Sequence, residues 1–190
     1  MPSRRLLYGL IAAALICTAW LAARSPLRAQ SSLTLPPIER LVVEKSARRM
    51  LAYAGGRLIH TFEHIQLGDA PVGAKQFQGD EKTPEGSFTI DYGNPRSAYH
   101  LSLHIAYPDA AAKAYAARAG RSPGGDIFIH GQPNALVGAD LGVRLPGDWT
   151  DGCIAVSNAE IEALWDAVED GTPIEIRKNG KDASHAPTAG

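Results

Sequence analysis

The sequence predicts a mainly β domain with a few short helices, preceded by an N-terminal hydrophobic segment. Of its 190 residues, 45% are apolar and 21% are charged, which is the composition of a globular protein. Short apolar or alternating runs, bounded by Gly, Pro and Asp, recur between residues 38 and 177 and are typical of strands. About 155 residues follow the N-terminal segment, which is enough for one compact core and too few for two ordinary domains.

Residues 1–30 are predicted to be a signal peptide or a membrane anchor. Arg4 and Arg5 precede an uncharged, apolar run over residues 6–23, and residues 1–30 contain no acidic residue. A basic start before an apolar core is typical of export signals, and this run also reaches the length that spans a bilayer. The positive-inside rule places the rest of the chain outside the cytoplasm. We therefore expect export to the periplasm, with the segment either cleaved or kept as an inner-membrane tether through residues 6–23.

The charge balance argues against a nucleic-acid partner. The chain has 19 Lys and Arg residues and 20 Asp and Glu residues, whereas nucleic-acid-binding domains carry a basic excess. Of its two cysteines, Cys17 lies in the N-terminal segment, so the exported domain has the single thiol of Cys153. An unpaired cysteine is unusual in an oxidising compartment. Cys153 is therefore a candidate nucleophile or intermolecular bridge, and an inert buried thiol is the alternative.

The first half of the domain is predicted to consist mainly of strands. Residues 31–37 form a polar linker, and Gly55 and Gly56 predict a hairpin turn between two strands. A long loop over residues 68–86 follows, and we expect it to border a functional cleft. An Ala-rich helix over residues 109–119 has Asp109 in its first turn. The predicted strands cover residues 38–44, 49–53, 58–67, 87–92 and 98–105.

The second half combines a short strand over residues 127–130 with a second long loop over residues 131–152. Ser157 and Glu160 form a capping box that opens a helix. The apolar residues of this helix recur at the spacing of one buried stripe, at Ile161, Leu164, Trp165 and Val168. A final strand covers residues 174–176, the domain ends near residue 177, and residues 178–190 are predicted to be a flexible tail.

Two pairs of histidines have a spacing of four residues, which chelates zinc when both lie on a helix. His60 and His64 form one pair, and His100 and His104 form the other. Both pairs fall on predicted strands, where residues four apart are separated by about 13 Å. We therefore expect no metal site and no cofactor.

Cys153 and His130 are the residues best suited to carry chemistry. A cysteine attacks as its thiolate and needs a partner that takes its proton, and a histidine at the rim of the same pocket suits that role. Gly152 allows unusual backbone angles, so the N–H groups of this turn can point at a developing oxyanion. The two residues are 23 positions apart, and spacing alone does not show that they meet.

The motifs around these residues resemble the L,D-transpeptidase catalytic domain (YkuD) family. The family pattern is a His, a spacer and then Ser/Thr-His-Gly-Cys. This chain has Ile129-His130-Gly131 and then Thr150-Asp151-Gly152-Cys153. The resemblance covers roughly residues 38–177 and includes similar segments at residues 43–46, 68–75, 79–86 and 123–125.

The resemblance implies a two-sheet β cradle that acts on the stem peptides of bacterial peptidoglycan. Cys153 would attack the carbonyl between the third stem residue, commonly meso-diaminopimelate, and the terminal D-Ala. D-Ala would leave, and an amine would take the acyl group from the thioester. His130 would act as general base and acid, and the N–H groups of Gly152 and Cys153 would help to form the oxyanion hole. We expect the protein to be a monomer. The expected substrate contacts are Gly131, Trp149, Thr150 and Asp151. An alternative role for Trp149 is to anchor its loop in the core.

Three departures from the family pattern leave the reaction open. Asp151 stands where the motif has His, Ala155 stands where many relatives carry Arg or Asn, and the spacer between His130 and Thr150 has 19 residues. The alternatives are an L,D-carboxypeptidase or amidase that uses water, and a non-catalytic module that binds peptidoglycan. Fast alkylation of Cys153 near neutral pH is the expected sign of an activated nucleophile.

Overall fold

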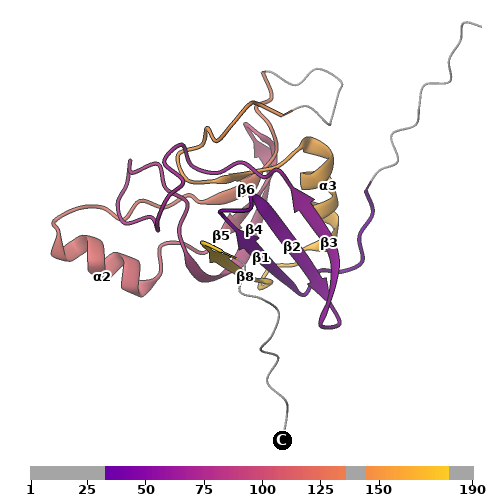
Figure 1. Ribbon diagram of the computed structural model, residues 1–190, viewed down its shortest axis with the longest axis horizontal. Helices are drawn as coiled ribbons and strands as arrows, with labels where there is room; N and C mark the ends of the chain where they lie inside the picture. Colours follow the sequence, from indigo (N-terminus) through magenta and orange to yellow (C-terminus); the bar gives the residue numbers. More distant parts are fainter. Residues whose placement is uncertain (1–32, 136–143, 180–190) are drawn as a thin grey trace, which may run out of the picture. The chain divides into compact units, whose positions relative to one another are not determined.

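The computed structural model describes residues 33–135 and 144–179 and is mainly β, as predicted (Figure 1). The signal or anchor predicted over residues 1–30 lies outside the described residues, as does the tail beyond Asn179. Within the described ranges, no helix is long and apolar enough to cross a membrane. The strands are β1 (Arg40–Glu44), β2 (Arg49–Ala54), β3 (Arg57–Glu63), β4 (Gly86–Ser97), β5 (His100–Ile105), β6 (Phe128–His130), β7 (Ile154–Ala155) and β8 (Pro173–Arg177); the helices are α2 (Ala110–Arg118) and α3 (Asn158–Ala167).

The strands form one mixed sheet in the order β3-β2-β1-β8-β4-β5-β6-β7. The two expected sheets are therefore two halves that share β4. The first residues of β4, 86–89, pair with β8, and the rest of the strand pairs with β5 across two irregularities in the register. The pairs β1–β8 and β6–β7 are parallel, and the other pairs are antiparallel.

Several predicted elements have different lengths in the structure, for local reasons. β3 ends at Glu63 rather than at residue 67, because His64 has a positive φ of 57° that interrupts the extended chain. β4 continues to Ser97, where the sequence predicts an end at residue 92, because Gly93 still pairs with Leu103 and a register shift between Asn94 and Ser97 accommodates Pro95. β7 has two residues, which is too short for any periodic signal.

Helix α3 covers one face of the half-sheet that carries the candidate site. Its capping box is present as predicted: the Ser157 side chain accepts from the N–H of Glu160, and a Glu160 carboxylate oxygen accepts from the N–H of Ser157. Trp165 packs so closely on β4 that a side-chain carbon at Gly93 would lie 2.7 Å from its ring. By contrast, α2 projects from the sheet with Ala116 as its one buried residue, and Asp109 is its N-cap (Figure 1).

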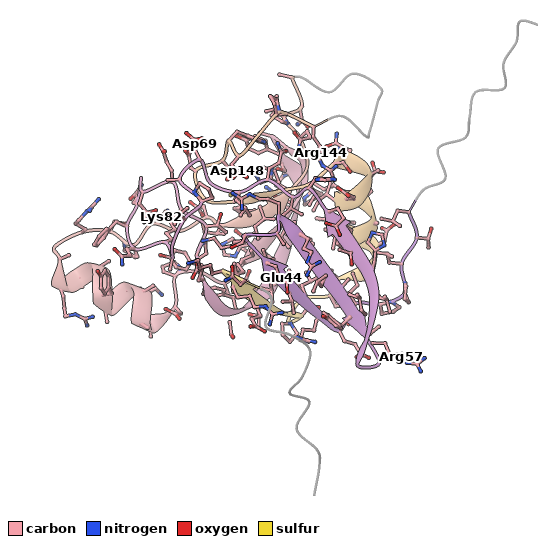
Figure 2. The ribbon with its side chains drawn as sticks, in the orientation of Figure 1. Glu44, Arg57, Asp69, Lys82, Arg144 and Asp148 are labelled. Atoms are coloured by element: carbon pink, nitrogen blue, oxygen red, sulfur yellow. The ribbon has the colours of Figure 1, made fainter. Side chains whose placement is uncertain are left out.

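Ion pairs and hydrogen bonds, some of them buried, fasten the two long loops to the sheet. The Lys45 ammonium, at the end of β1, donates to the carbonyls of Gly73 and Thr83 at 2.6 and 2.8 Å and pairs with Glu85 at 3.0 Å. Asp148, which belongs to the second loop and is labelled in Figure 2, pairs with Arg48 at 2.6 Å. These contacts hold both loops beside β6 and β7, where the candidate site lies.

Candidate active site

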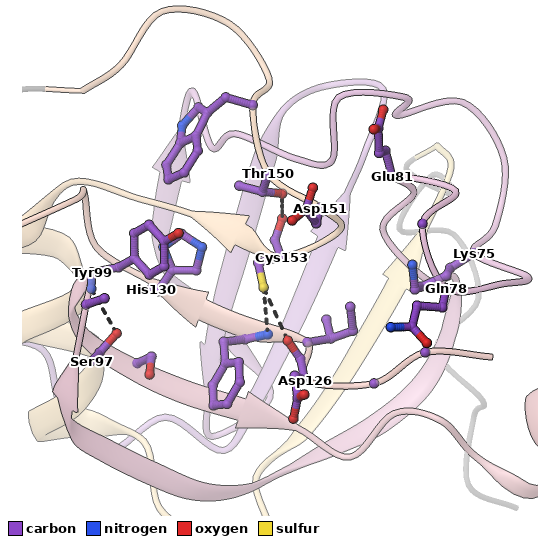
Figure 3. Close-up of a pocket in the computed structure, with 18 of the residues that line it drawn as sticks. Lys75, Gln78, Glu81, Ser97, Tyr99, Asp126, His130, Thr150, Asp151 and Cys153 are labelled. Atoms are coloured by element: carbon purple, nitrogen blue, oxygen red, sulfur yellow. Dashed lines mark hydrogen bonds between the residues drawn. The ribbon is translucent and has the colours of Figure 1, made fainter. Parts of the chain in front are cut away.

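The parallel pairing of β6 and β7 brings the predicted nucleophile and base together. Ile129 pairs with Ile154 and His130 with Ala155, so Cys153 lies beside Phe128 and two positions before His130 on the neighbouring strand. Side chains two apart share a face of the sheet, and this offset separates the two Cα atoms by about 8 Å. Both side chains line a cleft of about 930 Å³ and enter it from neighbouring strands (Figure 3). The opposite face of this half-sheet, with Leu103 and Ile129, is buried in the core.

The sulfur of Cys153 lies against the backbone that leads into β6. The N–H of Phe128 donates to Sγ at 3.4 Å, and the thiol faces the carbonyl of Asp126 at 3.5 Å (Figure 3). Burial raises the pKa of the Cys153 thiol to about 11, and the carboxylates of Asp151 and Asp126 act in the same direction. The Phe128 N–H and the Lys75 ammonium act in the opposite direction. The resting thiol is therefore protonated at neutral pH.

His130 is held as a neutral imidazole with one nitrogen available as a base. It is 4% exposed, and its Nδ1 lies 2.7 Å from the carbonyl oxygen of Gly131. Because a carbonyl only accepts hydrogen bonds, this contact assigns the proton to Nδ1 and the lone pair to Nε2. Burial lowers the pKa of His130 to about 4, although the Gly131 carbonyl acts in the opposite direction. The rings of Tyr99 and Trp149 pack against the imidazole, with centroids 4.5 and 5.6 Å away.

The turn before Cys153 is shaped by the Thr150 hydroxyl and by the glycine after Asp151. Thr150 Oγ1 donates to the carbonyl of Cys153 at 2.7 Å and accepts from the N–H of Gly152 at 3.2 Å. Gly152 has a φ of +126°, and a side-chain carbon there would lie 2.6 Å from the carbonyl oxygen of Lys82. The N–H of Gly152 thus donates within the turn, and the expected part of Gly152 and Cys153 in an oxyanion hole stays a prediction.

The four residues predicted to contact substrate differ in how far they are exposed to the cleft. Asp151 is exposed at the cleft, and Trp149 lines it while packing on His130, so Trp149 is both a lining residue and a loop anchor. Thr150 borders the cleft, but it is buried and its hydroxyl is used within the turn. Gly131 is buried, and a side-chain carbon there would lie 2.5 Å from Asn158 Oδ1. Its carbonyl orients His130, it is not among the described residues that line the cleft, and its contact with substrate stays a prediction.

Sequence reasoning missed three residues that complete the cleft: Lys75, Tyr99 and Asp126. Tyr99 sits in the turn between β4 and β5, where no local pattern distinguishes it from other strand-end aromatics. Asp126 has a positive φ of 55° that only the fold reveals. Lys75 falls in the segment 68–75 that resembles the family, and this resemblance was the one available signal.

Among the described residues, two other histidines pair with carboxylates away from the cleft chemistry. His100 Nε2 lies 2.8 Å from Glu162 Oε1, and His104 Nδ1 lies 2.5 Å from Asp91 Oδ1. His60 lies on β3, and His64 follows that strand. Within residues 33–135 and 144–179, no group of three potential ligands could hold a metal ion.

The model of the YkuD family, the L,D-transpeptidase catalytic domain, matches residues 38–176, and the chain belongs to this family. Among solved structures, it is similar to the helical cell shape determining protein Pgp2 from Campylobacter jejuni, with a TM-score of 0.58 and 26% identity over 80% of this chain. It also shares a fold with Bd1075 from Bdellovibrio bacteriovorus, with a TM-score of 0.51 and 24% identity over 78% of this chain. The matched region spans 53% of each of these two proteins. No curated protein gives a significant sequence match.

Proposed function

We propose that this protein is a cysteine L,D-transpeptidase of the cell envelope that acts on peptidoglycan stem peptides. The observation that carries the proposal is the shared cleft of Cys153 and His130, in a chain whose family is defined by this catalytic domain. The cleft volume of about 930 Å³ is large enough for several peptide residues. Because one similar structure is a helical cell shape determining protein, the proposal includes a role in cell shape.

The neutral dyad defines how the thiol attacks. With the pKa of the thiol near 11 and that of the imidazole near 4, full proton transfer from Cys153 to His130 before attack is strongly uphill. We therefore infer that His130 Nε2 takes the proton as Sγ bonds to the scissile carbonyl carbon, so that the developing charge passes to the substrate oxygen. The carbon–nitrogen bond then breaks, His130 returns the proton to the D-Ala amine, and a thioester remains on Cys153.

Transfer to an acceptor reverses these steps. A neutral amine attacks the thioester carbon, its proton moves to His130, and the carbon–sulfur bond breaks. The proton then returns to the sulfur as the new amide leaves. The enzyme is restored, and the net reaction exchanges one amide for another without a cofactor.

The proposal is tested by incubating the purified chain with a disaccharide-tetrapeptide and measuring D-Ala release and the mass of the protein. We expect release together with an acyl adduct on Cys153, and no release from the Cys153→Ala variant. The Cys17→Ala variant serves as the matched control and keeps full activity. Release that survives in the Cys153→Ala variant would show that the nucleophile is assigned wrongly.

Hydrolysis by the same residues is the second candidate function, and the exposed Asp151 carboxylate favours testing it. This carboxylate lines the cleft two residues before Cys153, and in the hydrolytic reaction we infer that it orients a water toward the thioester. Mass spectrometry of the products separates the two reactions, because a transpeptidase forms crosslinked dimers and a carboxypeptidase or amidase forms trimmed monomers. Absence of any acyl adduct would instead favour a non-catalytic binding module.

A further inference from the structure

One buried cation lines the cleft without a role in the proton transfers. Of the described residues that line the cleft, Lys75 is the one Lys or Arg, and it faces a lining that includes the acidic residues Glu81, Asp126 and Asp151. Its side chain is 3% exposed, which is rare for a lysine and costly unless the charge is compensated.

Lys75 is held rigidly but is not saturated with hydrogen bonds. Its ammonium donates to Asp80 Oδ1 at 2.9 Å, which is its one hydrogen bond among the described residues, and an ammonium has three N–H groups to donate. The Asp80 carboxylate also accepts from the backbone N–H groups of Gln76, Phe77 and Lys82. Asp80 is therefore also stabilised by the backbone, and Lys75 has N–H groups left to donate to an anionic ligand in the cleft.

The chain that leads into β6 orders the three functional groups along the cleft. Lys75 Cε lies 3.3 Å from the position of a side-chain carbon at Gly124. The sulfur of Cys153 contacts the Asp126 carbonyl and the Phe128 N–H, and His130 ends the strand. Lys75 and His130 therefore lie on opposite sides of the sulfur, as Figure 3 also shows.

Because Lys75 and His130 lie on opposite sides of the Cys153 sulfur, the two parts of the substrate can be placed relative to the nucleophile. His130 returns a proton to the leaving amine, so the leaving D-Ala extends toward His130. The acyl part of the substrate, which begins with the third stem residue, extends toward Lys75. Gly124 and Asp126 both have a positive φ, of 76° and 55°, so the chain between them spans less than the roughly 7 Å of two extended residues. In a diamino diacid such as diaminopimelate, six carbon–carbon bonds separate the scissile carbonyl carbon from the distal carboxylate carbon. These bonds span about 7 Å when extended, which is long enough for the distal carboxylate to reach the side of the cleft where Lys75 lies.

We propose that Lys75 binds the distal carboxylate of the third stem residue and makes the cleft selective for a diamino acid that carries it. The inference rests on the proposed function, because that function supplies the scissile carbonyl of this residue. A carboxamide at the same position keeps one acceptor oxygen but has no negative charge, and lysine has no group there. Both changes leave the buried cation without its anion.

The test measures binding rather than turnover, in the full chain with Cys153→Ala. Calorimetric titration compares a disaccharide-tetrapeptide that has diaminopimelate with the same ligand amidated at the distal carboxylate. We expect the free carboxylate to bind roughly 10- to 100-fold more tightly. Adding Lys75→Met should reduce this preference to within about twofold, whereas Lys75→Arg, which keeps the cation, should retain it. Lys82→Met removes a cation that does not line the cleft and is the matched control.

The outcomes separate this inference from the proposed function. Equal affinity for the two ligands, or a preference that survives Lys75→Met in a chain with unchanged melting temperature, overturns the role of Lys75. A lost preference in the Lys75→Met variant, with the Lys82→Met control unchanged, supports it even if the unaltered chain releases no D-Ala. That last result would count against the proposed reaction alone, because binding selectivity does not require turnover.

Discussion

Burial leaves His130 uncharged in the folded chain, and this makes the free energy of unfolding depend on pH. Its pKa is about 4 in the fold, against a usual value of 6.5, because a buried imidazolium loses its hydration. Below pH 6.5 the unfolded chain binds a proton at this residue that the folded chain does not bind. Stability is therefore lost as the pH falls from about 6.5 to about 4, and it is fully present above that window.

We expect the free energy of unfolding to fall by about 2 kcal/mol more in the unaltered chain than in His130→Gln between pH 7 and pH 5. Glutamine removes the titrating group and keeps a polar side chain that can donate to the Gly131 carbonyl. Urea unfolding at the two pH values, followed by circular dichroism, measures the difference. Equal losses in both chains would mean that His130 titrates normally in the fold.

The Cys153 thiol is expected to react slowly with alkylating agents at rest, because only the thiolate attacks and burial raises the thiol pKa to about 11. In the Cys17→Ala chain, the rate with iodoacetamide should increase about tenfold per pH unit from pH 7 to pH 10. At pH 7.5 it should be on the order of 100-fold below that of free cysteine. A plateau near neutral pH would contradict this expectation.

The raised thiol pKa therefore changes one expectation from the sequence, namely that fast alkylation identifies an activated nucleophile. Burial slows the reaction of the Cys153 thiol whether or not the protein is an enzyme. The acyl adduct on Cys153 therefore separates the enzyme from the binding module, and the alkylation rate does not.

The turn that carries the nucleophile depends on Gly152 for steric reasons. We expect Gly152→Ala to lower the free energy of unfolding by at least about 2 kcal/mol, because its φ of +126° is strained for alanine and the new carbon meets the Lys82 carbonyl at 2.6 Å. Displacement of Cys153 should also reduce kcat/KM for D-Ala release roughly 100-fold. Urea unfolding and the release assay measure the two effects.

Gly147→Ala provides the matched control for this prediction. Gly147 lies in the same long loop with a φ of +69°, but a side-chain carbon there meets nothing within 4 Å. Gly147→Ala should therefore lower the free energy of unfolding by about 1 kcal/mol through backbone strain and leave the activity nearly unchanged. Similar effects of the two substitutions would show that backbone strain alone, without the contact to Lys82, explains the need for Gly152.

Elements with a local signal could be predicted from the sequence, and elements defined by distant partners could not. The hairpin at Gly55 and Gly56 and the capping box at Ser157 each need only a few neighbouring residues. β7 exists because Ala155 pairs with β6 on one side and with Gln66 on the other, and nothing in its own two residues predicts this. The end of β3 depends on the backbone angle of His64, which an alternating pattern does not reveal.

The same distinction holds for the site as part of the whole molecule. His130 and Cys153 could be predicted because a motif, a lone thiol and a glycine mark them within the chain. Lys75 and Tyr99 come from other loops, and only the order of the strands brings these loops to the same cleft. Their place could not be inferred without knowing that β4 joins the two halves of the sheet.

The position of β8 makes the last described strand essential to the whole sheet. β8 lies between β1 and β4, so it joins the three strands before the first long loop to the four strands that carry the cleft. Ile174 and Ile176 are each 1% exposed. Arg177 pairs with Glu44, a carboxylate that is 2% exposed, at 2.8 Å. Removing β8 would expose apolar surface on both halves and leave a buried charge without this partner.

We therefore expect a chain that stops after Thr172 to lose cooperative unfolding, tertiary structure and D-Ala release together, although it keeps both Cys153 and His130. A chain that stops after Asn179 keeps β8 and the hydrogen bond from Ser46 Oγ to Asn179 Oδ1 at 2.7 Å, and it should melt cooperatively and remain active. Near-ultraviolet circular dichroism and thermal melting compare the two. If the shorter chain kept a folded, active β4–β7 half, the two halves would be separate folding units, and β8 would join them without stabilising the site.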